Sequence, residues 1–283
     1  MKRVGALLGV TLVLSAASPE LNQARKLYEL TEFEQSLKIL QAIPVKDAAV
    51  YALMGRDYFM NGDYKKATDV LEKAVAAEPE NSDYALWLGR AYGRRAETSN
   101  PLSAIGHASK TRQYLERAVH LNPRDIDALN DLLEYYMNAP GFMGGGMDKA
   151  KATVARIAQV DPAEGPWAEA MLDERRKEYG SAEEHLRRAI DLAPHQVGRV
   201  IELAKFLSKQ GRYQEADQSF ARAEQMAPNS PRLMYAKADS YIKAGRKLKE
   251  ARELLEHYLS ATITPDDPPK ADARKLLHQI QGG

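Results

Sequence analysis

The sequence predicts an all-α protein, a solenoid of stacked helical hairpins. Two observations predict this fold class: one amphipathic helix recurs along the chain, and the remnant of a partner helix precedes each copy. In each copy a small residue is followed four positions on by an aliphatic or aromatic residue, three further on by an apolar residue, and five further on by proline. These spacings place the apolar side chains on one helical face, and proline ends the helix because it lacks an amide donor. The copies are Ala67, Leu71, Ala74, Pro79; Thr111, Leu115, Ala118, Pro123; Ala150, Val154, Ile157, Pro162; Ala182, Leu186, Ala189, Pro194; and Ala216, Phe220, Ala223, Pro228.

The partner helix is clearest before the first copy, between Tyr51 and Tyr58. It offers bulky apolar residues for packing and one small residue, Gly55, where a neighbouring helix can cross closely. Asn61 and Gly62 then turn the chain into the second helix, because both residue types tolerate the left-handed backbone that ends helices. The repeated unit is therefore a helical hairpin.

The hairpin from Ala48 to Asn81 is 34 residues long, and the order of its marked positions resembles the tetratricopeptide repeat. The resemblance implies a right-handed superhelical solenoid of about seven such hairpins. Residues 197–230 form a clean copy, the first and last copies are degenerate, and the final segment is a capping helix that covers an exposed end. The predicted repeats span residues 21–47, 48–81, 82–125, 126–162, 163–196, 197–230 and 231–265, followed by a cap at 268–281.

Two of the repeats are longer than the others. The marked prolines at positions 79, 123, 162, 194 and 228 are 44, 39, 32 and 34 residues apart. The first excess lies between Arg94 and Lys110, where Thr98 to Pro101 have the composition of a loop. The second is the segment Pro-Gly-Phe-Met-Gly-Gly-Gly-Met at 140–147. Because insertions in a repeat array extend loops on one rim, we expect these neighbouring loops to form a projecting ledge that contacts a partner.

The glycines of the second insertion allow two interpretations. A phosphate-binding loop would end in Gly-Lys-Ser or Gly-Lys-Thr, whereas Met147 and Asp148 follow here. One interpretation is a long turn in which glycine permits left-handed backbone. The other is that free amides at the start of the next helix hold a partner's carboxylate, which makes Gly144, Gly145 and Gly146 candidate contacts. The loop resembles those of exported bacterial members of the repeat class.

The first residues have the layout of a secretory signal peptide. Lys2 and Arg3 precede an apolar run from Val4 to Leu14, and small residues at 15–17 favour cleavage after Ala17. A retained membrane anchor is the alternative, but the run falls short of the about 20 apolar residues that a spanning helix needs. We therefore expect an exported protein, periplasmic or secreted.

Composition excludes several function classes. Without Lys2 and Arg3 the chain has 38 basic and 39 acidic residues, so it lacks the basic excess of a nucleic-acid binder. It has no cysteine, which excludes disulfides, thiol nucleophiles and thiolate metal sites. The six histidines never form a zinc-protease pair, no serine lies in a nucleophile elbow, and residues 183–185, Glu-Glu-His, are better explained as a solvated face than as a metal cluster. We predict no catalytic residue, no metal and no cofactor.

Function must then reside on the surface of the solenoid. In tetratricopeptide proteins, positions 2, 5, 9 and 12 of the first helix line the concave groove that receives peptides or helices, and the resemblance carries this role over by register. Trp167 lies in a shortened repeat, where we expect core rather than groove. The family's clamp for terminal carboxylates uses lysine and asparagine at fixed positions, which this sequence lacks. With Arg94 added from position 13, the groove candidates are Arg56, Phe59, Leu86, Arg90, Arg94, Asn130, Glu134, Met137, Ile201, Lys205, Tyr235 and Asp239.

Three of these candidates are arginines in the amino-terminal half of the groove. Arg56, Arg90 and Arg94 suit an acidic or carboxylate-bearing peptide, because arginine binds a carboxylate bidentately. Ordinary surface charge, paired with acids such as Asp57 or Asp83, is the competing interpretation.

The features together predict a non-catalytic scaffold that binds a protein or peptide partner in its concave groove. A structural or assembly subunit of a cell-envelope complex, using the convex face or the ends, is the alternative. A carbohydrate- or lipid-binding accessory has only the aromatic residues Tyr28, Phe59 and Tyr235 in its favour.

Overall fold

The computed structural model describes residues 18–281, so the predicted signal peptide, residues 1–17, lies outside the described residues. Over the described range the chain forms fifteen α-helices and one 3-10 turn, with no strand, which confirms the predicted all-α solenoid. Each predicted repeat holds one helical hairpin, and α15 (Lys270–Gln281) follows the last of them. The hairpins are α1 (Pro19–Glu29) with α2 (Phe33–Ala42), α3 (Ala48–Met60) with α4 (Tyr64–Ala77), α5 (Ser82–Thr98) with α6 (Pro101–Leu121), α7 (Ile126–Asn138) with α8 (Met147–Val160), α9 (Gly165–Arg176) with α10 (Tyr179–Leu192), α11 (Val197–Lys209) with α12 (Tyr213–Met226), and α13 (Pro231–Lys243) with α14 (Leu248–Ser260).

Local sequence explains where many of these helices begin and end. The Asp47 carboxylate caps α3 by accepting the Val50 amide at 2.8 Å, and Asp125, Asp63, Asn81 and Asn100 cap later helices in the same way. Between the two helices of a hairpin the chain turns through left-handed glycines, with φ of +79° in the second hairpin, +74° in the sixth and +63° in the seventh. None of the described helices is long and apolar enough to cross a membrane.

The core runs as a band between the paired helices. Gly55 of α3 lies where α4 crosses closely, as predicted: a β-carbon built there would lie only 2.3 Å from Leu71 Cγ. Gly89 of α5 lies in the same relation to α6, where a β-carbon would lie 2.9 Å from Leu115 Cδ2. The small residue therefore sets the distance between the two helices of a hairpin.

The first long repeat differs from its prediction. Only Ser99 and Asn100 separate α5 from α6, so the extra residues lengthen two helices instead of forming a loop. Asn100 caps α6 through the Ser103 amide, and Pro101 occupies its first turn. The flanking residues include no proline beyond Pro101, and the glycines among them, Gly93 and Gly106, are isolated, so the helices continue through them. The N-terminal turns of α6 project with Leu102 87% exposed and Ile105 52% exposed.

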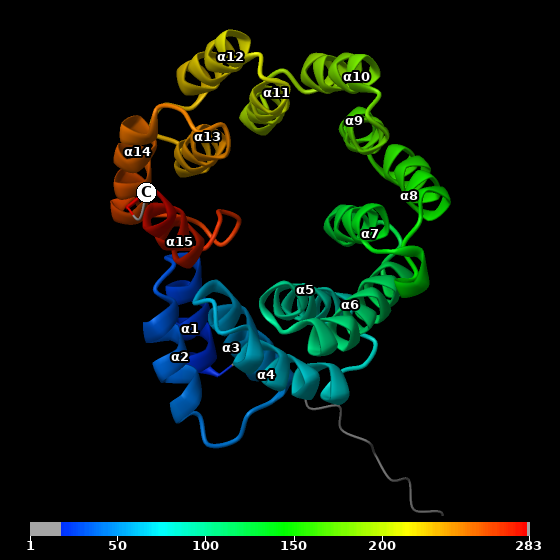
Figure 1. The fold of residues 1–283 in the computed structure, drawn as a ribbon. Helices are drawn as coiled ribbons and strands as arrows, with labels where there is room; N and C mark the ends of the chain where they lie inside the picture. The colour runs from blue at the N-terminus through cyan, green and yellow to red at the C-terminus, as the bar shows by residue number, and fades with distance from the viewer. Residues whose placement is uncertain (1–17, 282–283) are drawn as a thin grey trace, which may run out of the picture.

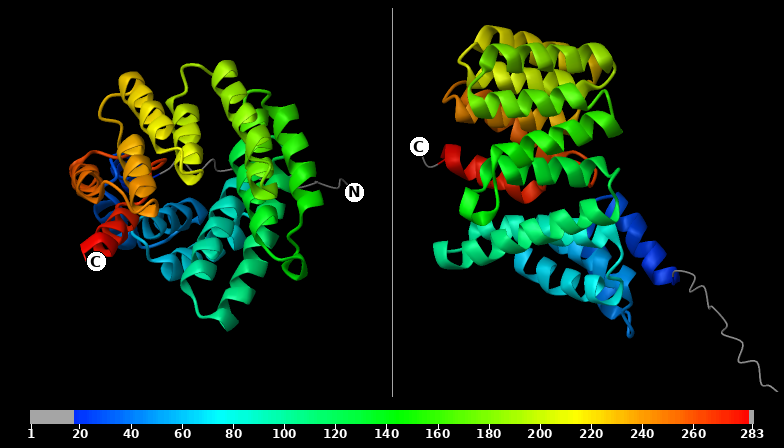
Figure 2. Two further views of the ribbon diagram at one scale, coloured as in Figure 1. Left: turned by 45° about the horizontal axis from the view of Figure 1, so that its top comes forward. Right: turned by 90° about the vertical axis from the view of Figure 1, so that its right-hand side faces the viewer.

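The hairpins follow one another around a closed ring (Figure 1). The first helices of the hairpins, such as α7, α11 and α13, form the inner wall, and their partners α8, α12 and α14 form the outer wall (Figure 1). The cap α15 packs against α13 and α14 and lies beside the amino-terminal hairpins, which further views also show (Figure 2). An open superhelix with a covered end was expected, whereas the two ends of the array meet.

Candidate functional site

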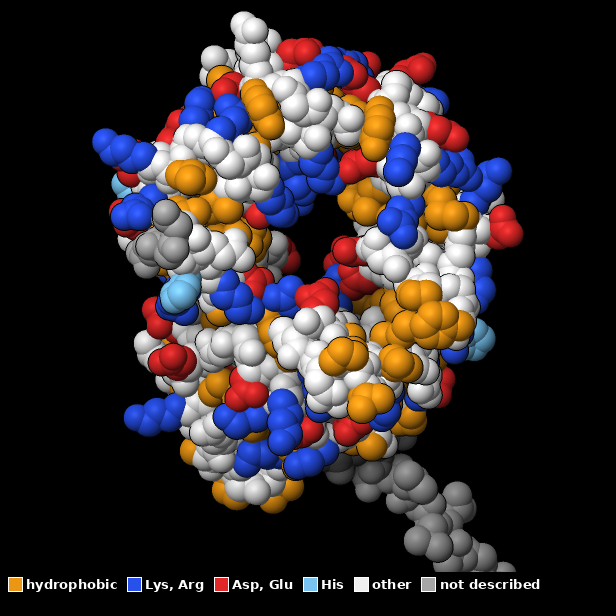
Figure 3. Space-filling model, viewed as in Figure 1, with side chains coloured by type: hydrophobic (Ala, Val, Ile, Leu, Met, Phe, Trp, Pro, Cys, Tyr) orange, Lys and Arg blue, Asp and Glu red, His pale blue; other side chains and the backbone are white. Residues whose placement is uncertain are grey.

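An opening passes through the middle of the ring, edged by both basic and acidic side chains (Figure 3). Two open cavities lie on its inner wall. The larger, of about 1070 Å³, is lined by α3, α5 and α7 together with the loop between α14 and α15. The smaller, of about 640 Å³, lies between α7, α9 and α11. The inner wall is thus the concave surface that the repeats predict.

Most of the predicted groove residues reach these cavities, although the register is imperfect. Leu86 and Ile201 were wrongly placed: they are 4% and 1% exposed and belong to the core, because the adjacent inner helix packs over that side of α5 and α11. The indole next to Leu86, that of Trp87, lines the larger cavity instead. The larger cavity is lined by Arg56, Phe59, Arg90, Arg94 and Glu134, and the smaller by Asn130, Glu134, Met137 and Lys205.

The candidates near the carboxyl end are covered by the chain itself. Tyr235 packs with the aromatic ring of Tyr258 at 5.4 Å between centroids, in the hydrophobic cluster beneath α15. Burial raises the pKa of Tyr235, and Asp272 and Asp239 raise it further. Asp239 itself pairs with Lys243 on the same helix at 2.7 Å. This end of the predicted groove is therefore closed.

Trp87 is the centre of an arginine–aromatic cluster on the inner wall. The guanidinium carbons of Arg56 and Arg90 lie 5.1 and 5.3 Å from the centroid of its ring. Phe59 contacts Trp87 edge to face, with 5.5 Å between ring centroids. Tryptophan gives the most favourable face for a guanidinium, so the cluster holds both arginines in place. Trp87 is not among the predicted groove residues. Its position three residues before Arg90, on the same helical face, is the sequence signal that indicates it.

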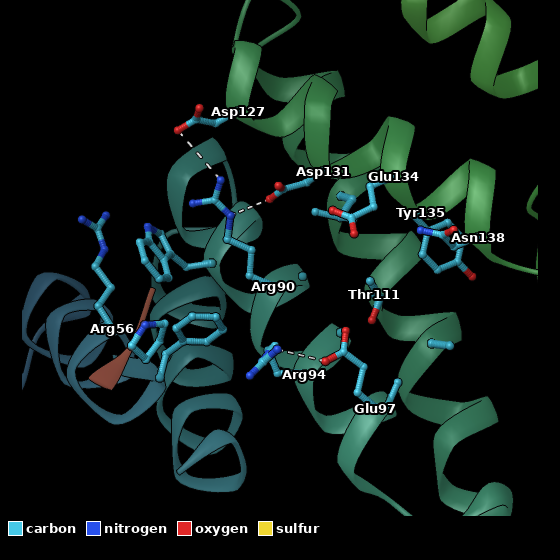
Figure 4. Close-up of a pocket in the computed structure, with 18 of the residues that line it drawn as sticks. Arg56, Arg90, Arg94, Glu97, Thr111, Asp127, Asp131, Glu134, Tyr135 and Asn138 are labelled. Atoms are coloured by element: carbon cyan, nitrogen blue, oxygen red, sulfur yellow. Dashed lines mark hydrogen bonds and ion pairs between the residues drawn. The ribbon is translucent and has the colours of Figure 1, made fainter. Parts of the chain in front are cut away.

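Both of these arginines also have carboxylate partners, and Figure 4 shows those of Arg90. Arg56 pairs with Asp83, as the competing interpretation of its charge predicts, and Arg90 pairs with Asp131 of α7. The alternative partner Asp57 was wrong: it is buried on the other side of α3, where it accepts a hydrogen bond from Ser36 Oγ at 2.7 Å. Arg56 and Arg90 thus link consecutive repeats, and each already has a carboxylate beside it.

Arg94 is held differently. Its Nη2 donates to the Tyr64 hydroxyl at 2.8 Å and to the two carboxylate oxygens of Asp272 at 2.9 and 3.0 Å. Its Nη1 donates to Glu97 at 3.1 Å. Asp272 lies in the first turn of α15, 178 residues further along the chain. Neither Tyr64 nor Asp272 is suggested by the groove register.

Glu134 lies on the inner wall and has no hydrogen bond or ion pair with another described residue. The Glu134 side chain borders both cavities and is exposed to the solvent that fills them. Burial raises the pKa of the Glu134 carboxyl, and the nearby carboxylates of Asp131 and Glu97 raise it further. Glu134 is therefore available to a partner's donor group.

The glycine-rich loop uses its own amides. The amides of Gly144, Gly145 and Gly146 donate to the carbonyls of residues 141, 140 and 136, at 2.9, 3.2 and 2.9 Å. Gly144 has φ of +86°, and a β-carbon on Gly145 would lie 1.9 Å from the Ala139 carbonyl oxygen. These contacts favour the interpretation as a turn over that of a carboxylate site. The 3-10 turn η1 (Gly141–Met143) exposes Phe142, which is 82% exposed.

The acidic and histidine residues of α10 are occupied by neighbours. Glu183 pairs with Arg187 at 2.5 Å and with Arg212, and His185 Nδ1 lies 2.9 Å from Asp173 Oδ2. Across residues 18–281 the structure brings together no group of three or more side chains suited to a metal ion. Trp167 packs between two core clusters and also borders the smaller cavity, so it is partly core and partly groove.

Comparison with known proteins supports the repeat architecture. Family models of the tetratricopeptide repeat match residues 48–91 and 207–280. A tetratricopeptide repeat protein of Parabacteroides merdae ATCC 43184 aligns with 93% of this chain and 97% of its own, at 14% identity and a TM-score of 0.59. A thermophilic one of Thermus thermophilus aligns with 66% of this chain and 97% of its own, at 20% identity and a TM-score of 0.54. At these identities the similarity shows the fold, and no curated protein matches significantly.

Proposed function

The chain is a tetratricopeptide repeat protein, and on that premise we propose that it is a non-catalytic scaffold that binds a protein or peptide partner on the inner wall of its ring. The observation that carries this proposal is the open cavity of about 1070 Å³, to which several repeats contribute side chains. A cavity of this size can take several side chains of an extended segment.

The inner wall offers contacts of two kinds. Phe59 and Trp87 supply aromatic surface, the residue type that anchors most protein interfaces. Glu134 supplies a polar group that no described residue pairs with, and the side chain of Asn130, whose amide nitrogen donates to Glu164 at 3.1 Å, borders the smaller cavity. A peptide would satisfy such groups with its own donors.

The test is comparative capture of partners from the envelope of the source cell. Glu134→Arg reverses a charge that no other residue uses, so the fold should persist while partner capture falls at least tenfold. The matched control is Glu184→Arg, an exposed and unpaired position on the outer helix α10. Unchanged capture by the inner-wall variant, with loss in the outer-wall control, would contradict the proposal.

A second candidate, an assembly subunit that uses the rim, is favoured by one observation. Leu102, Ile105 and Phe142 are exposed at the two lengthened repeats, and η1 packs against α6. Exposed apolar patches of this kind mark contact surfaces. Capture that is lost in Phe142→Asp and retained in Glu134→Arg would favour this candidate.

We also propose that the protein is exported, to the periplasm or outside the cell. The basic start, the short apolar run and the small residues before Ser18 support this proposal. Amino-terminal sequencing of protein purified from the source cell should begin at Ser18. A mature chain that still begins at Met1 would contradict it.

A further inference from the structure

The carboxyl-terminal segment crosses from the last hairpin to the first three. After α14 ends at Ser260, the loop that contains Pro265, Asp266 and Pro269 lines the same cavity as Tyr28 of α1 and the arginines of α3 and α5. The loop and α15 therefore form a bridge between the two ends of the array, and they border the inner wall on which a partner would lie.

The two ends of this bridge are attached by different means. On the side of the last hairpin, Ile263 and Ala273 are fully buried with Tyr258 and Leu255 in an apolar cluster. On the side of the first hairpins the named contacts are the Arg94–Asp272 ion pair and the approach of Ala271 to Gly62. Apolar burial is a strong attachment and a single partly exposed ion pair is a weak one. If the ring opens, it opens at Arg94.

The carboxylate site at Arg94 is built without help from α15. Tyr64 accepts a hydrogen bond from the guanidinium and places its ring 5.0 Å beneath it, while Glu97 holds the other nitrogen. All three residues belong to α4 and α5, so the site stays in place when Asp272 leaves. Arg56 and Arg90 differ, because their carboxylates come from the next inner helix along the ring.

We propose that residues 261–281 are a clasp that closes the ring, with Asp272 as an internal ligand of a carboxylate site at Arg94, and that an acidic side chain of the partner replaces Asp272 when the ring opens. The second half of this proposal rests on the proposed function. The first half does not, because closure is a property of the free chain.

Closure can be measured by single-molecule energy transfer. The chain has no cysteine, so dyes can be placed on cysteines introduced at Lys65 of α4 and Gln279 of α15, both exposed. Arg94→Asp and Asp272→Arg should each raise the open-to-closed ratio about tenfold, and the double reversal should restore it, since the pair re-forms with opposite signs. Arg187→Gln, which removes an exposed same-helix ion pair on the outer helix α10, is the control and should leave the ring closed.

The energy transfer measured in these variants shows whether the Arg94–Asp272 pair closes the ring. Single reversals that leave energy transfer unchanged, or a double reversal as open as the single ones, would overturn the clasp. Both results are obtained without any partner, so they are independent of whether the inner wall binds a protein.

Exchange of the carboxylate is tested with a labelled peptide of residues 264–281. It should bind the full-length Asp272→Ala chain at least tenfold more tightly than the wild-type chain, whose site is filled. The same peptide with asparagine in place of Asp272, and an additional Arg94→Ala change in the chain, should each abolish that gain. Equal binding to the wild-type and Asp272→Ala chains would overturn the exchange.

Discussion

Replacing one buried carboxyl should remove a pH-dependent contribution to stability at the amino-terminal hairpins. Asp57 of α3 is fully buried, its Oδ2 accepts a hydrogen bond from Ser36 at 2.7 Å, and its Oδ1 has no partner. Burial raises its pKa from 3.8 to about 8, against the lowering effect of the Ser36 hydrogen bond. At neutral pH the folded chain therefore holds a proton that the unfolded chain has lost.

This difference in bound protons makes the wild-type fold less stable as the pH rises. Stability due to the protonated carboxyl is fully present below pH 3.8 and is lost as the pH rises towards 8, because the unfolded state releases its proton first. Four pKa units correspond to about 5 kcal/mol. Asparagine does not ionise, but its buried amide nitrogen lacks an acceptor, at a cost of about 1–3 kcal/mol. Asp57→Asn should thus stabilise the fold by about 2–4 kcal/mol at pH 8 and destabilise it by about 1–3 kcal/mol near pH 4.

Urea unfolding at several pH values, followed by tryptophan fluorescence, measures the effect. Trp87 lies in the neighbouring repeat and reports on this part of the array. Subtracting the free energy of unfolding of the wild type from that of the variant at each pH cancels the contributions of the other titrating groups. Ser36→Ala serves as a control, because it keeps the Asp57 carboxyl. A difference that stays constant between pH 4 and pH 8 would refute the reasoning.

Two further predictions concern contacts within and between hairpins. Gly55→Ala should destabilise the fold by about 1–3 kcal/mol, because the added methyl group collides with Leu71. Gly106→Ala adds a methyl group in open space and should stabilise α6 by about 0.5–1 kcal/mol. Thermal unfolding of the two variants measures both changes in stability. Asp217→Asn should destabilise the last two hairpins at neutral pH, because hydrogen bonds from Arg246 hold the pKa of the Asp217 carboxyl well below its usual range. This loss should shrink as acid protonates wild-type Asp217, and a loss that grows at low pH would contradict the assignment.

The fold could be predicted because its determinants are local. Each hairpin packs mainly against its neighbours, so the spacing of Ala67, Leu71 and Ala74 around one helix was enough to predict a unit that repeats. Gly55 is predicted to mark a close crossing, and the structure shows that a β-carbon there would collide with Leu71. The predicted loop after Arg94 is wrong, because the extra residues lengthen α5 and α6 on either side of Ser99 and Asn100.

The inner wall could be predicted only to within one residue of register. Arg56 and Phe59 line the larger cavity, whereas Leu86 belongs to the core and its neighbour Trp87 lines the cavity in its place. One position on a helix rotates the side chain by about 100°, which is enough to exchange a core residue for a groove residue. Packing between successive inner helices decides which side of α5 is covered, and that packing depends on the tilt of each hairpin.

The closure of the ring cannot be predicted from the sequence, and the reason is geometric. The position of α15 relative to Arg94 is the sum of the small rotations at every joint between the third hairpin and the cap, and side-chain volumes at each joint set those rotations. An error of a few degrees at each joint would separate Asp272 from Arg94 altogether. The lengthened α5 did indicate where to look, because its extra turn carries Glu97, which orients the Arg94 guanidinium. The extra length of α5 therefore predicts where the carboxylate site lies. Its ligand, Asp272, can be identified only from the structure, in which the two ends of the array meet.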